Sequence, residues 1–231
     1  MFARKLDLPP SRDLPWPLRP LASAETGLEY DRFGRMVMSI RHGVLKGISP
    51  PMLAWWFGNI AGQVVVGEVS FDRYLAWHPY DHIRWELAKP AVGGGVGVGA
   101  RFRIVEAFGR NPDYHVDVIE TVARLDETGI ELVGDVLGFE VSRLRHDFVS
   151  VAGGTQYISR LTIGSDLALL GPFANRMIRR MVFSEAMGMA WLRHNVEEVG
   201  QLEYLLPLLY PRDGIEGSDP RDAVRERGVS K

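Results

Sequence analysis

The chemically most informative residues of this chain are a histidine and a glutamate four positions apart, His194 and Glu198. Side chains at positions i and i+4 share one face of a helix, so both residues can reach a single ion. The same spacing also occurs in ordinary surface pairs that stabilise a helix. Because Met187, Trp191 and Leu202 repeat along a compatible stripe, we expect the pair to lie on or beside the inward helix face.

A second group of candidates lies in the block Trp-His-Pro-Tyr-Asp-His at residues 77–82, which holds two imidazoles, those of His78 and His82, and the carboxylate of Asp81. Histidine is the commonest metal ligand. The alternative is a pair of hydrogen-bonded structural histidines near a turn that Asp81 caps. The residues by themselves leave both interpretations open.

A third candidate is a carboxylate within an apolar strand face. Residues 101–108 alternate so that Glu106 points the same way as Phe102, Ile104 and Phe108. An unpaired ion there would be unfavourable by several kcal/mol, or the group would become neutral. Its partner is either a buried arginine or a divalent cation that it shares with histidines.

The composition of the 231-residue chain limits the possible chemistry. It has no cysteine, so a metal site must use His, Asp and Glu, and there are six histidines. Lys and Arg number 27 against 29 Asp and Glu, and a net charge of -2 disfavours nucleic-acid and membrane partners. With no apolar run of spanning length and no apolar signal region near the N-terminus, we expect a cytoplasmic protein.

The chain divides into three parts. Five prolines in residues 1–28 predict an extended N-terminal arm, which Trp16 would fix to the domain. We expect one domain over residues 29–211 and a mobile polar tail over 212–231. The glycine-rich stretch 93–99 lies between an aromatic segment and a strand, which is typical of a connector and not of a nucleotide-binding loop.

The predicted elements are mostly strands followed by one long helix. A first apolar helix begins at Ser49 and ends near Gly62. The strands form an antiparallel meander, at residues 101–108, 114–125, 130–141, 145–151 and 155–163, and the long helix spans about 172–203, with Pro207 after it. Such a helix would lie across the curved sheet in a helix-grip arrangement and enclose a cavity, which five tryptophans could line: Trp55, Trp56, Trp77, Trp85 and Trp191.

Together, these motifs resemble the diacetylphloroglucinol hydrolase family over roughly residues 30–205. The resemblance rests on Met-Leu-Ala-Trp-Trp-Phe at 52–57, on Tyr-Leu-Ala-Trp-His-Pro-Tyr-Asp-His at 74–82, on the inward Glu106 and on the late His-x-x-x-Glu pair. It implies an α+β fold of the START-like helix-grip type. It also implies a zinc enzyme that hydrolyses the carbon-carbon bond between an acyl group and a phenolic ring.

The resemblance also implies a set of site residues. Carried over by position, the zinc ligands are His82, Glu106, His194 and Glu198. The eight-residue step from Tyr74 selects His82 over His78, which leaves a supporting role open for His78. The spacing to Glu106 is shorter than the family's, so Glu120 is an alternative acidic ligand.

Three further positions match the family's polar cavity residues, namely Tyr74, His146 and Tyr157, which would bind the phenolic oxygens and relay a proton. Trp85 stands where the family has an asparagine. We expect a small, polyketide-like acylated phenol or a related beta-dicarbonyl compound as substrate.

Two other functions use the same residues. Helix-grip proteins also act as non-catalytic carriers of apolar ligands, because a fold does not fix a function. A non-haem iron oxygenase would use His82, His194 and one carboxylate. A homodimer is a further possibility if Trp55 and Trp56 are exposed on the early helix.

Overall fold

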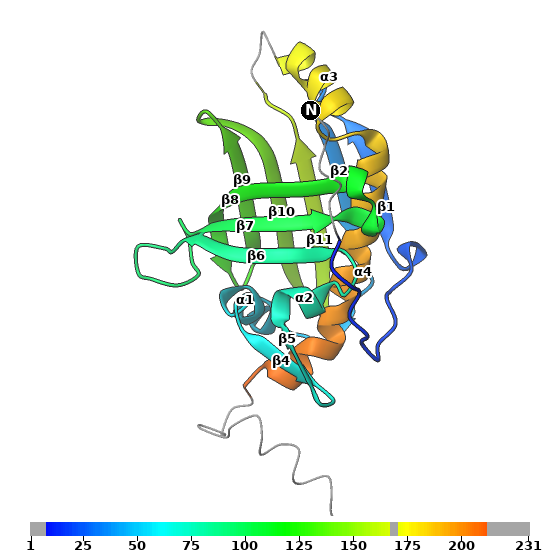
Figure 1. Cartoon of the computed structure of the whole chain (residues 1–231), viewed down its shortest axis with the longest axis vertical. Coiled ribbons are helices and arrows are strands. Elements are labelled where there is room, and N and C mark those ends of the chain that lie inside the picture. The colour runs from blue at the N-terminus through cyan, green and yellow to red at the C-terminus, as the bar shows by residue number, and fades with distance from the viewer. Residues whose placement is uncertain (1–7, 167–170, 212–231) are drawn as a thin grey trace, which may run out of the picture.

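The computed structural model describes residues 8–166 and 171–211, so the expected tail at 212–231 lies outside the described residues. A long antiparallel sheet curves around one side of the molecule (Figure 1). Its strands follow the order β1-β2-β11-β10-β9-β8-β7-β6, and the short β3 also pairs with β11. Their bounds are β1 Glu25–Tyr30, β2 Met36–Arg41, β3 Leu45–Lys46, β6 His82–Lys89, β7 Arg101–Ala107, β8 His115–Asp126, β9 Gly129–Val136, β10 Phe139–Val151 and β11 Gly154–Ile163.

Two helices, α1 Pro50–Gly58 and α4 Glu185–Leu209, pack against this sheet. A small two-stranded hairpin, β4 Gln63–Val66 and β5 Val69–Asp72, packs against α2 Arg73–Trp77. The other helical segments are α3 Gly171–Met181 and the short 3₁₀ segments η1 Leu21–Ser23, η2 Phe108–Arg110 and η3 Pro112–Tyr114. No described helix is long and apolar enough to cross a membrane.

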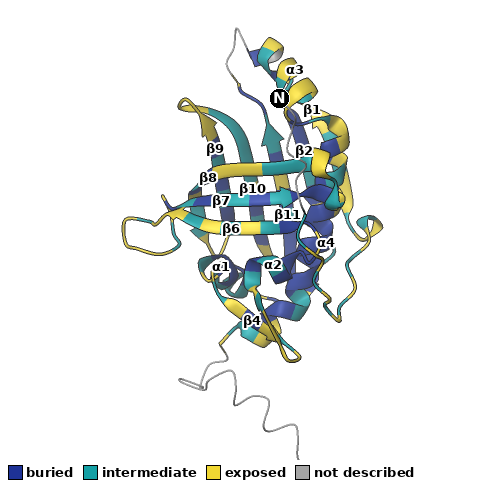
Figure 2. Cartoon of the chain, viewed as in Figure 1, coloured by how far each residue is buried: buried dark blue, intermediate teal, exposed yellow. Residues whose placement is uncertain are grey.

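The long C-terminal helix α4 packs against the sheet, which confirms the predicted helix-grip fold. It contacts β1, β2 and β3 on one side and α1 and α2 near its C-terminal end. Figure 2 shows α4 as mostly buried, whereas the β4–β5 hairpin is mostly exposed. Because buried residues lie on several sides of α4, its sequence lacks a clean amphipathic stripe.

The predicted helix over 172–203 is in fact two helices. The chain breaks at Val182–Ser184, and α4 restarts after Ser184, whose side-chain oxygen accepts the Met187 N–H at 3.2 Å. A serine that satisfies an otherwise unpaired amide is a favoured helix N-cap. The helix also continues past Pro207 to Leu209, because the fully buried Leu206 holds its last turn against the core.

The strand predictions also need correction. The predicted strand 130–141 is split by a tight turn at Leu137 and Gly138, whose φ angles are 53° and 83°. Two consecutive residues with positive φ are typical of a two-residue hairpin turn. The strand after this turn, β10, is continuous to Val151 and includes the predicted 145–151. The first helix, α1, ends at Gly58 and not at Gly62.

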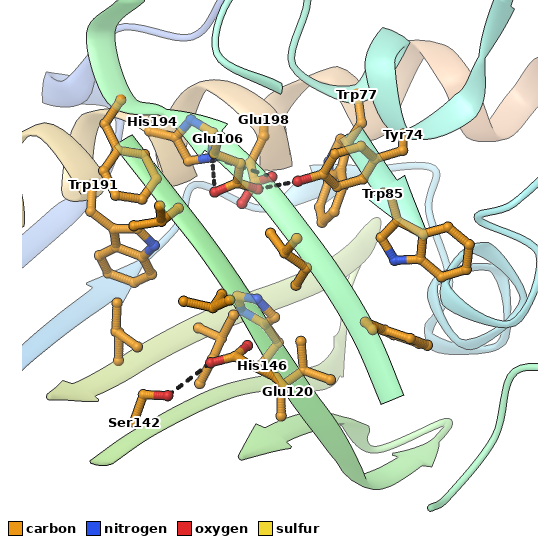
Figure 3. Close-up of a pocket in the computed structure, with 18 of the residues that line it drawn as sticks. Tyr74, Trp77, Trp85, Glu106, Glu120, Ser142, His146, Trp191, His194 and Glu198 are labelled. Atoms are coloured by element: carbon orange, nitrogen blue, oxygen red, sulfur yellow. Dashed lines mark hydrogen bonds and ion pairs between the residues drawn. The ribbon is translucent and has the colours of Figure 1, made fainter. Parts of the chain in front are cut away.

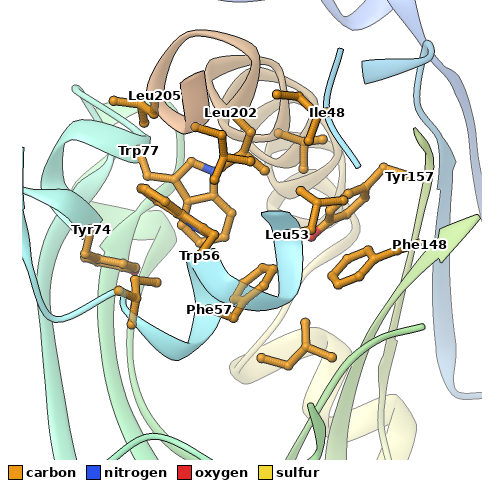
Figure 4. Close-up of a cluster of buried hydrophobic side chains, with 14 of the residues drawn as sticks. Ile48, Leu53, Trp56, Phe57, Tyr74, Trp77, Phe148, Tyr157, Leu202 and Leu205 are labelled. Atoms are coloured by element: carbon orange, nitrogen blue, oxygen red, sulfur yellow. The ribbon is translucent and has the colours of Figure 1, made fainter. Parts of the chain in front are cut away.

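A large aromatic and aliphatic cluster fills the space between α1, α2 and the C-terminal half of α4 (Figure 4). Trp56 is fully buried there, and its ring meets that of Trp77 edge-on with centroids 5.8 Å apart. Trp55 packs edge-on against Tyr210 at 5.7 Å. The expected dimer contact through this helix would require Trp56 on the surface. Because Trp56 is buried, it is not available for such a contact.

The N-terminal arm crosses the outer surface of α4. Trp16 stacks on Tyr204 with ring centroids 5.5 Å apart and planes 3° from parallel. The guanidinium of Arg19 forms an ion pair with Glu203 at 2.5 Å. These contacts attach the arm to the helix that carries His194 and Glu198.

The cap at Ser184 gives a stability prediction. We expect Ser184→Ala to lower the free energy of unfolding by about 1 kcal/mol, because the Met187 amide loses its acceptor. Urea denaturation measures this change. Ser184→Asp keeps an acceptor and should retain most of the stability, and equal stabilities for wild type and Ser184→Ala would show that the cap contributes nothing.

Candidate metal centre

The candidate ligands meet between strand β6, strand β7 and helix α4. The antiparallel register places His82 directly opposite Glu106, so both side chains point to the same face of the sheet. His82 Nε2 lies 3.3 Å from Glu106 Oε1 and 3.3 Å from Glu198 Oε2. Two strands and one helix therefore bring an imidazole and two carboxylates together.

His194 completes this group from the helix. Its Nε2 lies 3.7 Å from Glu106 Oε2 and 3.8 Å from Glu198 Oε2. The i, i+4 spacing places His194 and Glu198 on the same face of α4. Figure 3 shows His194, Glu106 and Glu198 facing one another across the top of a cavity.

In each of the two imidazoles, Nδ1 forms a hydrogen bond on the side away from the carboxylates. This bond fixes the ring so that Nε2 faces the carboxylates. His82 Nδ1 donates to the backbone carbonyl of Tyr74 at 2.6 Å, and a carbonyl oxygen can only accept. The proton therefore resides on Nδ1, and Nε2 carries the lone pair. That Nε2 is buried and has no hydrogen-bond partner within residues 8–166 and 171–211. A cation between His82, Glu106 and Glu198 would satisfy it.

Asp81 holds the second imidazole in the same way. His194 Nδ1 donates to Asp81 Oδ2 at 3.0 Å, which directs Nε2 toward Glu106 and Glu198. Asp81 also accepts the backbone N–H groups of Gly109 and Arg110 at 2.8 and 3.0 Å. A carboxylate behind a ligating histidine is a recurrent feature of metal sites, because it fixes the tautomer and orientation of the ring. The sequence left Asp81 open between a member of the candidate site and a turn cap.

His78 is a supporting residue in this geometry. Its Nδ1 accepts the Asp81 N–H at 3.1 Å, and its Nε2 donates to Glu197 at 3.2 Å. Both ring nitrogens are thus engaged within the described part of the chain, so His78 itself has no free lone pair for a metal. The His78 ring stacks on His194 at 4.5 Å and so supports its position.

The electrostatics of the centre reflect its deep burial. Burial lowers the pKa of His82 to about 4, although Glu106 acts in the opposite direction. Burial also acts to lower the pKa of His194, but the charges of Glu106 and Glu198 and the Asp81 hydrogen bond outweigh it and raise that pKa to about 9. Positive charge is therefore favoured between the carboxylates, as a cation-binding site requires.

Nitrogen and carboxylate donors of this kind fit zinc, and they also fit iron and other first-row metals. Two imidazoles and two carboxylates form a four-donor set in which each imidazole has its outer nitrogen anchored, and metal binding would displace the proton that His194 holds in the metal-free protein. The donor chemistry selects a divalent transition metal but does not by itself select which one.

A mostly apolar cavity lies beside the candidate centre. Its lining includes Glu106, His194 and Glu198 at one end. Three of the five tryptophans that were expected to line it do so, namely Trp77, Trp85 and Trp191. Trp55 and Trp56 belong to the neighbouring hydrophobic cluster instead.

Tyr74 contacts both the cavity and the centre. Its hydroxyl donates to Glu106 Oε1, and its ring stacks on His82 at 3.9 Å. Burial and the neighbouring Glu106 raise the pKa of Tyr74 well above its usual value, so the phenol keeps its proton. The tyrosine expected to bind substrate therefore also orients one of the candidate ligands.

His146 also lines the cavity, and a buried chain of polar groups holds it from behind. Its Nδ1 lies 2.9 Å from the Ser159 hydroxyl, which lies 2.9 Å from His42 Nε2. Burial lowers the pKa of His146 to about 3, so the ring is neutral. Neither Ser159 nor His42 could be found from the sequence, because each is a single polar residue without a motif.

Neither Tyr157 nor Glu120 forms a hydrogen bond or ion pair with the four candidate ligands in the described part of the chain. Tyr157 is fully buried beside His146 and Phe148 and is not among the cavity-lining residues, and its hydroxyl has no hydrogen-bond partner among the described residues. Glu120 does line the cavity, but its carboxylate accepts a hydrogen bond from Ser142 at 2.9 Å. The structure thus brings Glu106, and not Glu120, to the two imidazoles.

The model of one protein family, described as "DAPG hydrolase PhiG domain", matches residues 20–211. The chain belongs to the DAPG hydrolase family. This family match spans every residue of the candidate centre and the cavity. No curated protein matches the sequence.

Several solved structures match this DAPG hydrolase family member at low sequence identity. A START superfamily protein from Mycobacterium smegmatis is 14% identical, with 75% of this chain and 99% of that chain covered and a TM-score of 0.48. A protein from Rhodobacter sphaeroides is 14% identical, with 80% and 99% covered and a TM-score of 0.44. A protein from Nitrosomonas europaea is 11% identical, with 77% and 96% covered and a TM-score of 0.44.

The bond from His194 to Asp81 predicts a metal-binding defect in this DAPG hydrolase domain. We expect Asp81→Asn to weaken metal affinity about 10- to 100-fold, because the imidazole loses its charged acceptor. Chelator competition measures the affinity. Asp113→Asn, at an exposed position, is the matched control, and an unchanged affinity in Asp81→Asn would contradict the orienting role.

Glu120 gives a prediction about pH. Burial raises the pKa of Glu120 from 4.5 to about 7, so the folded protein holds this proton more tightly than the unfolded chain. The stability from the protonated group is fully present below pH 4.5 and is lost as pH rises through 7. Relative to Glu120→Gln, the wild type should lose roughly 3 kcal/mol of unfolding free energy between pH 4 and 8.

Urea denaturation of both proteins across that pH range measures this difference. The other titrating groups are common to both proteins, so their contributions cancel. Glu127→Gln, an exposed substitution in a turn, should track the wild type at every pH. Parallel stability curves for wild type and Glu120→Gln would refute the raised pKa.

Proposed function

We propose that this DAPG hydrolase domain is a zinc-dependent hydrolase that cleaves the carbon-carbon bond between an acyl group and a phenolic ring. The single observation that carries the proposal is the orphaned His82 Nε2, buried and facing two carboxylates. His194 faces the same carboxylates, and the group opens onto an apolar cavity. A buried site of this composition beside a cavity supports chemistry on a bound small molecule.

The residues that would hold zinc are His82, Glu106, His194 and Glu198. When bound there, zinc supplies Lewis acidity that polarises a carbonyl or phenolate oxygen of the substrate. Asp81 and the Tyr74 carbonyl keep the two imidazoles in the required tautomer. The Tyr74 hydroxyl keeps Glu106 in place and reaches the cavity wall, where it can also contact a phenolic oxygen.

The proposed reaction consumes one water. Its oxygen adds to the acyl carbon, and the bond from that carbon to the ring breaks. The electron pair stays on the ring carbon, which takes up a proton, so the products are a carboxylic acid and the deacylated phenol. Ring oxygens ortho or para to that carbon are needed, because they spread the negative charge before the proton arrives.

His146 is the proposed proton carrier. The ring is neutral, lines the cavity, and has Nδ1 engaged with Ser159, which leaves Nε2 to exchange a proton with the ligand or with water. A neutral imidazole can accept a proton from water and then donate it to the carbon of the phenolic ring that lost the acyl group. The cavity's apolar walls, including Trp85 and Trp191, suit the flat ring and acyl chain of such a substrate.

A histidine substitution tests this function. We expect His194→Ala to lose bound zinc and at least 1,000-fold in turnover of acylated phenols, because the domain loses a ligand, while the fold is retained. Elemental analysis and release of carboxylic acid from a panel of acylated phenols measure both effects. His115 is the one histidine of the six that is not buried, so His115→Ala is the matched control.

The same measurements separate the rival functions. Zinc in the purified wild type together with acid release supports the hydrolase. Iron with oxygen consumption would support an oxygenase. Binding of apolar ligands with neither metal nor turnover would support a carrier, and full activity in His194→Ala would refute the proposed centre.

A further inference from the structure

The cavity contains a second polar position, formed by Glu120 and Ser142. We propose that this pair binds a ring hydroxyl of the substrate para to the acyl group. The inference rests on the proposed function and assigns to it two specificity-determining residues on the far side of the cavity from the candidate ligands.

Three neighbouring strands build this position. Glu120 on β8 lies opposite Gly134 on β9, and Gly134 lies opposite Ser142 on β10. Residues that face one another across antiparallel strands point to the same side of the sheet, so both polar side chains face the cavity. The Ser142 hydroxyl donates to Glu120 Oε1 at 2.9 Å across the glycine between them.

The glycine is what permits this contact. A Cβ on Gly134 would collide with the Ser142 hydroxyl and would lie 3.4 Å from Glu120 Oε1. Any side chain at this position would therefore separate the two groups or fill the space in front of them. The bare strand between Glu120 and Ser142 leaves a polar recess in the cavity wall.

The carboxyl group in this recess is only partly satisfied. Glu120 is 6% exposed, and Ser142 is its only side-chain hydrogen-bond partner in the described part of the chain. Burial without a cationic partner raises its pKa to about 7. A buried carboxyl group that retains hydrogen-bonding capacity in an apolar cavity is unfavourable unless a ligand supplies a partner.

The residues beside Glu120 and Ser142 in the cavity wall are apolar, so a ligand would have to supply the further hydrogen-bond partner of Glu120. The same row of the sheet places Phe102 beside Glu120 and Ile163 beside Ser142, and both residues line the cavity. Figure 3 shows apolar side chains and His146 between the Glu120–Ser142 pair and the Glu106–Glu198 group. A ligand that fills this space therefore meets polar groups at both ends and His146 along its length.

The separation of these places suits an aromatic ring. Glu120 lies opposite Phe102, and Glu106 follows Phe102 by four residues on the same strand, which corresponds to about 13 Å of strand. A ring whose acyl group faces Glu106 therefore directs its para substituent toward Glu120.

A hydroxyl group matches the chemistry of this recess. The protonated carboxyl group can donate, and the Ser142 oxygen and the carboxyl group can also accept. A phenolic hydroxyl both donates and accepts, whereas a methyl or hydrogen substituent would leave Glu120 with the Ser142 hydroxyl as its single hydrogen-bond partner among the described residues. Sites that hydrogen-bond a substrate hydroxyl reject analogues that lack it.

The test compares two acylated phenols that differ only in the para hydroxyl. For each protein, the readouts are the ratio of kcat/KM values and the ratio of Kd values, the latter from quenching of tryptophan fluorescence in metal-free protein. The two phenols differ in intrinsic reactivity by the same factor in every variant, so that factor cancels when variants are compared. Binding to metal-free protein reports on the recess without turnover.

We expect wild type to favour the para-hydroxylated compound, and Glu120→Leu to reduce this preference about 10- to 100-fold in both ratios. Glu120→Gln keeps a donor and an acceptor and should retain most of the preference. Ser142→Ala should lose part of it and serves as a second variant if Glu120→Leu folds poorly. Glu127→Gln is the exposed control and should behave like the wild type.

An unchanged preference in both Glu120→Leu and Ser142→Ala would overturn the inference while leaving the hydrolase proposal intact. If the wild type neither binds nor cleaves any acylated phenol, the proposed function itself fails and this inference fails with it. The two failures are distinct, because the first appears only in the variants and the second appears in the wild type.

Discussion

The structure depends on one electrostatic constraint, the burial of two carboxylates, Glu106 and Glu198, against two imidazoles. Each imidazole is anchored through Nδ1, so the Nε2 atoms must face the carboxylates. The result is a concentrated set of donor atoms that requires positive charge between them. The β6–β7 register, the helical spacing on α4 and the position of Asp81 all serve this arrangement.

The helix-grip fold explains how residues so far apart in the chain meet. The curved sheet supplies His82 and Glu106 from adjacent strands, and α4 supplies His194 and Glu198 from a single face. Between the sheet and the helices lies an apolar cavity, into which the candidate centre opens. Rigid elements on both sides hold the charged groups in place, while the apolar walls keep water away and strengthen their interactions.

The sequence predicted the parts that local periodicity encodes. The spacing of His194 and Glu198 and the inward direction of Glu106 follow from helix and strand geometry, and the family motif selected His82. The sequence did not predict hydrogen bonds that depend on how distant segments pack together, such as those between Asp81 and His194 and between Ser142 and Glu120. No local pattern records those contacts.

The predicted elements failed where a single residue decided the outcome. The break before α4 depends on the Ser184 cap within a sequence that is otherwise helical in period. The turn at Leu137 depends on a non-glycine residue with positive φ, which composition does not reveal. A side-chain hydrogen bond at Ser184 and the pairing of β9 with β10 around Leu137 outweighed the local propensity.

The most direct test of the central claim is an anomalous-diffraction map from a crystal of the zinc-loaded protein. One strong peak should lie between the Nε2 atoms of His82 and His194 and the carboxylates of Glu106 and Glu198. A peak at His78 and Asp81 instead, or no peak in protein that elemental analysis shows to contain zinc, would contradict the claim.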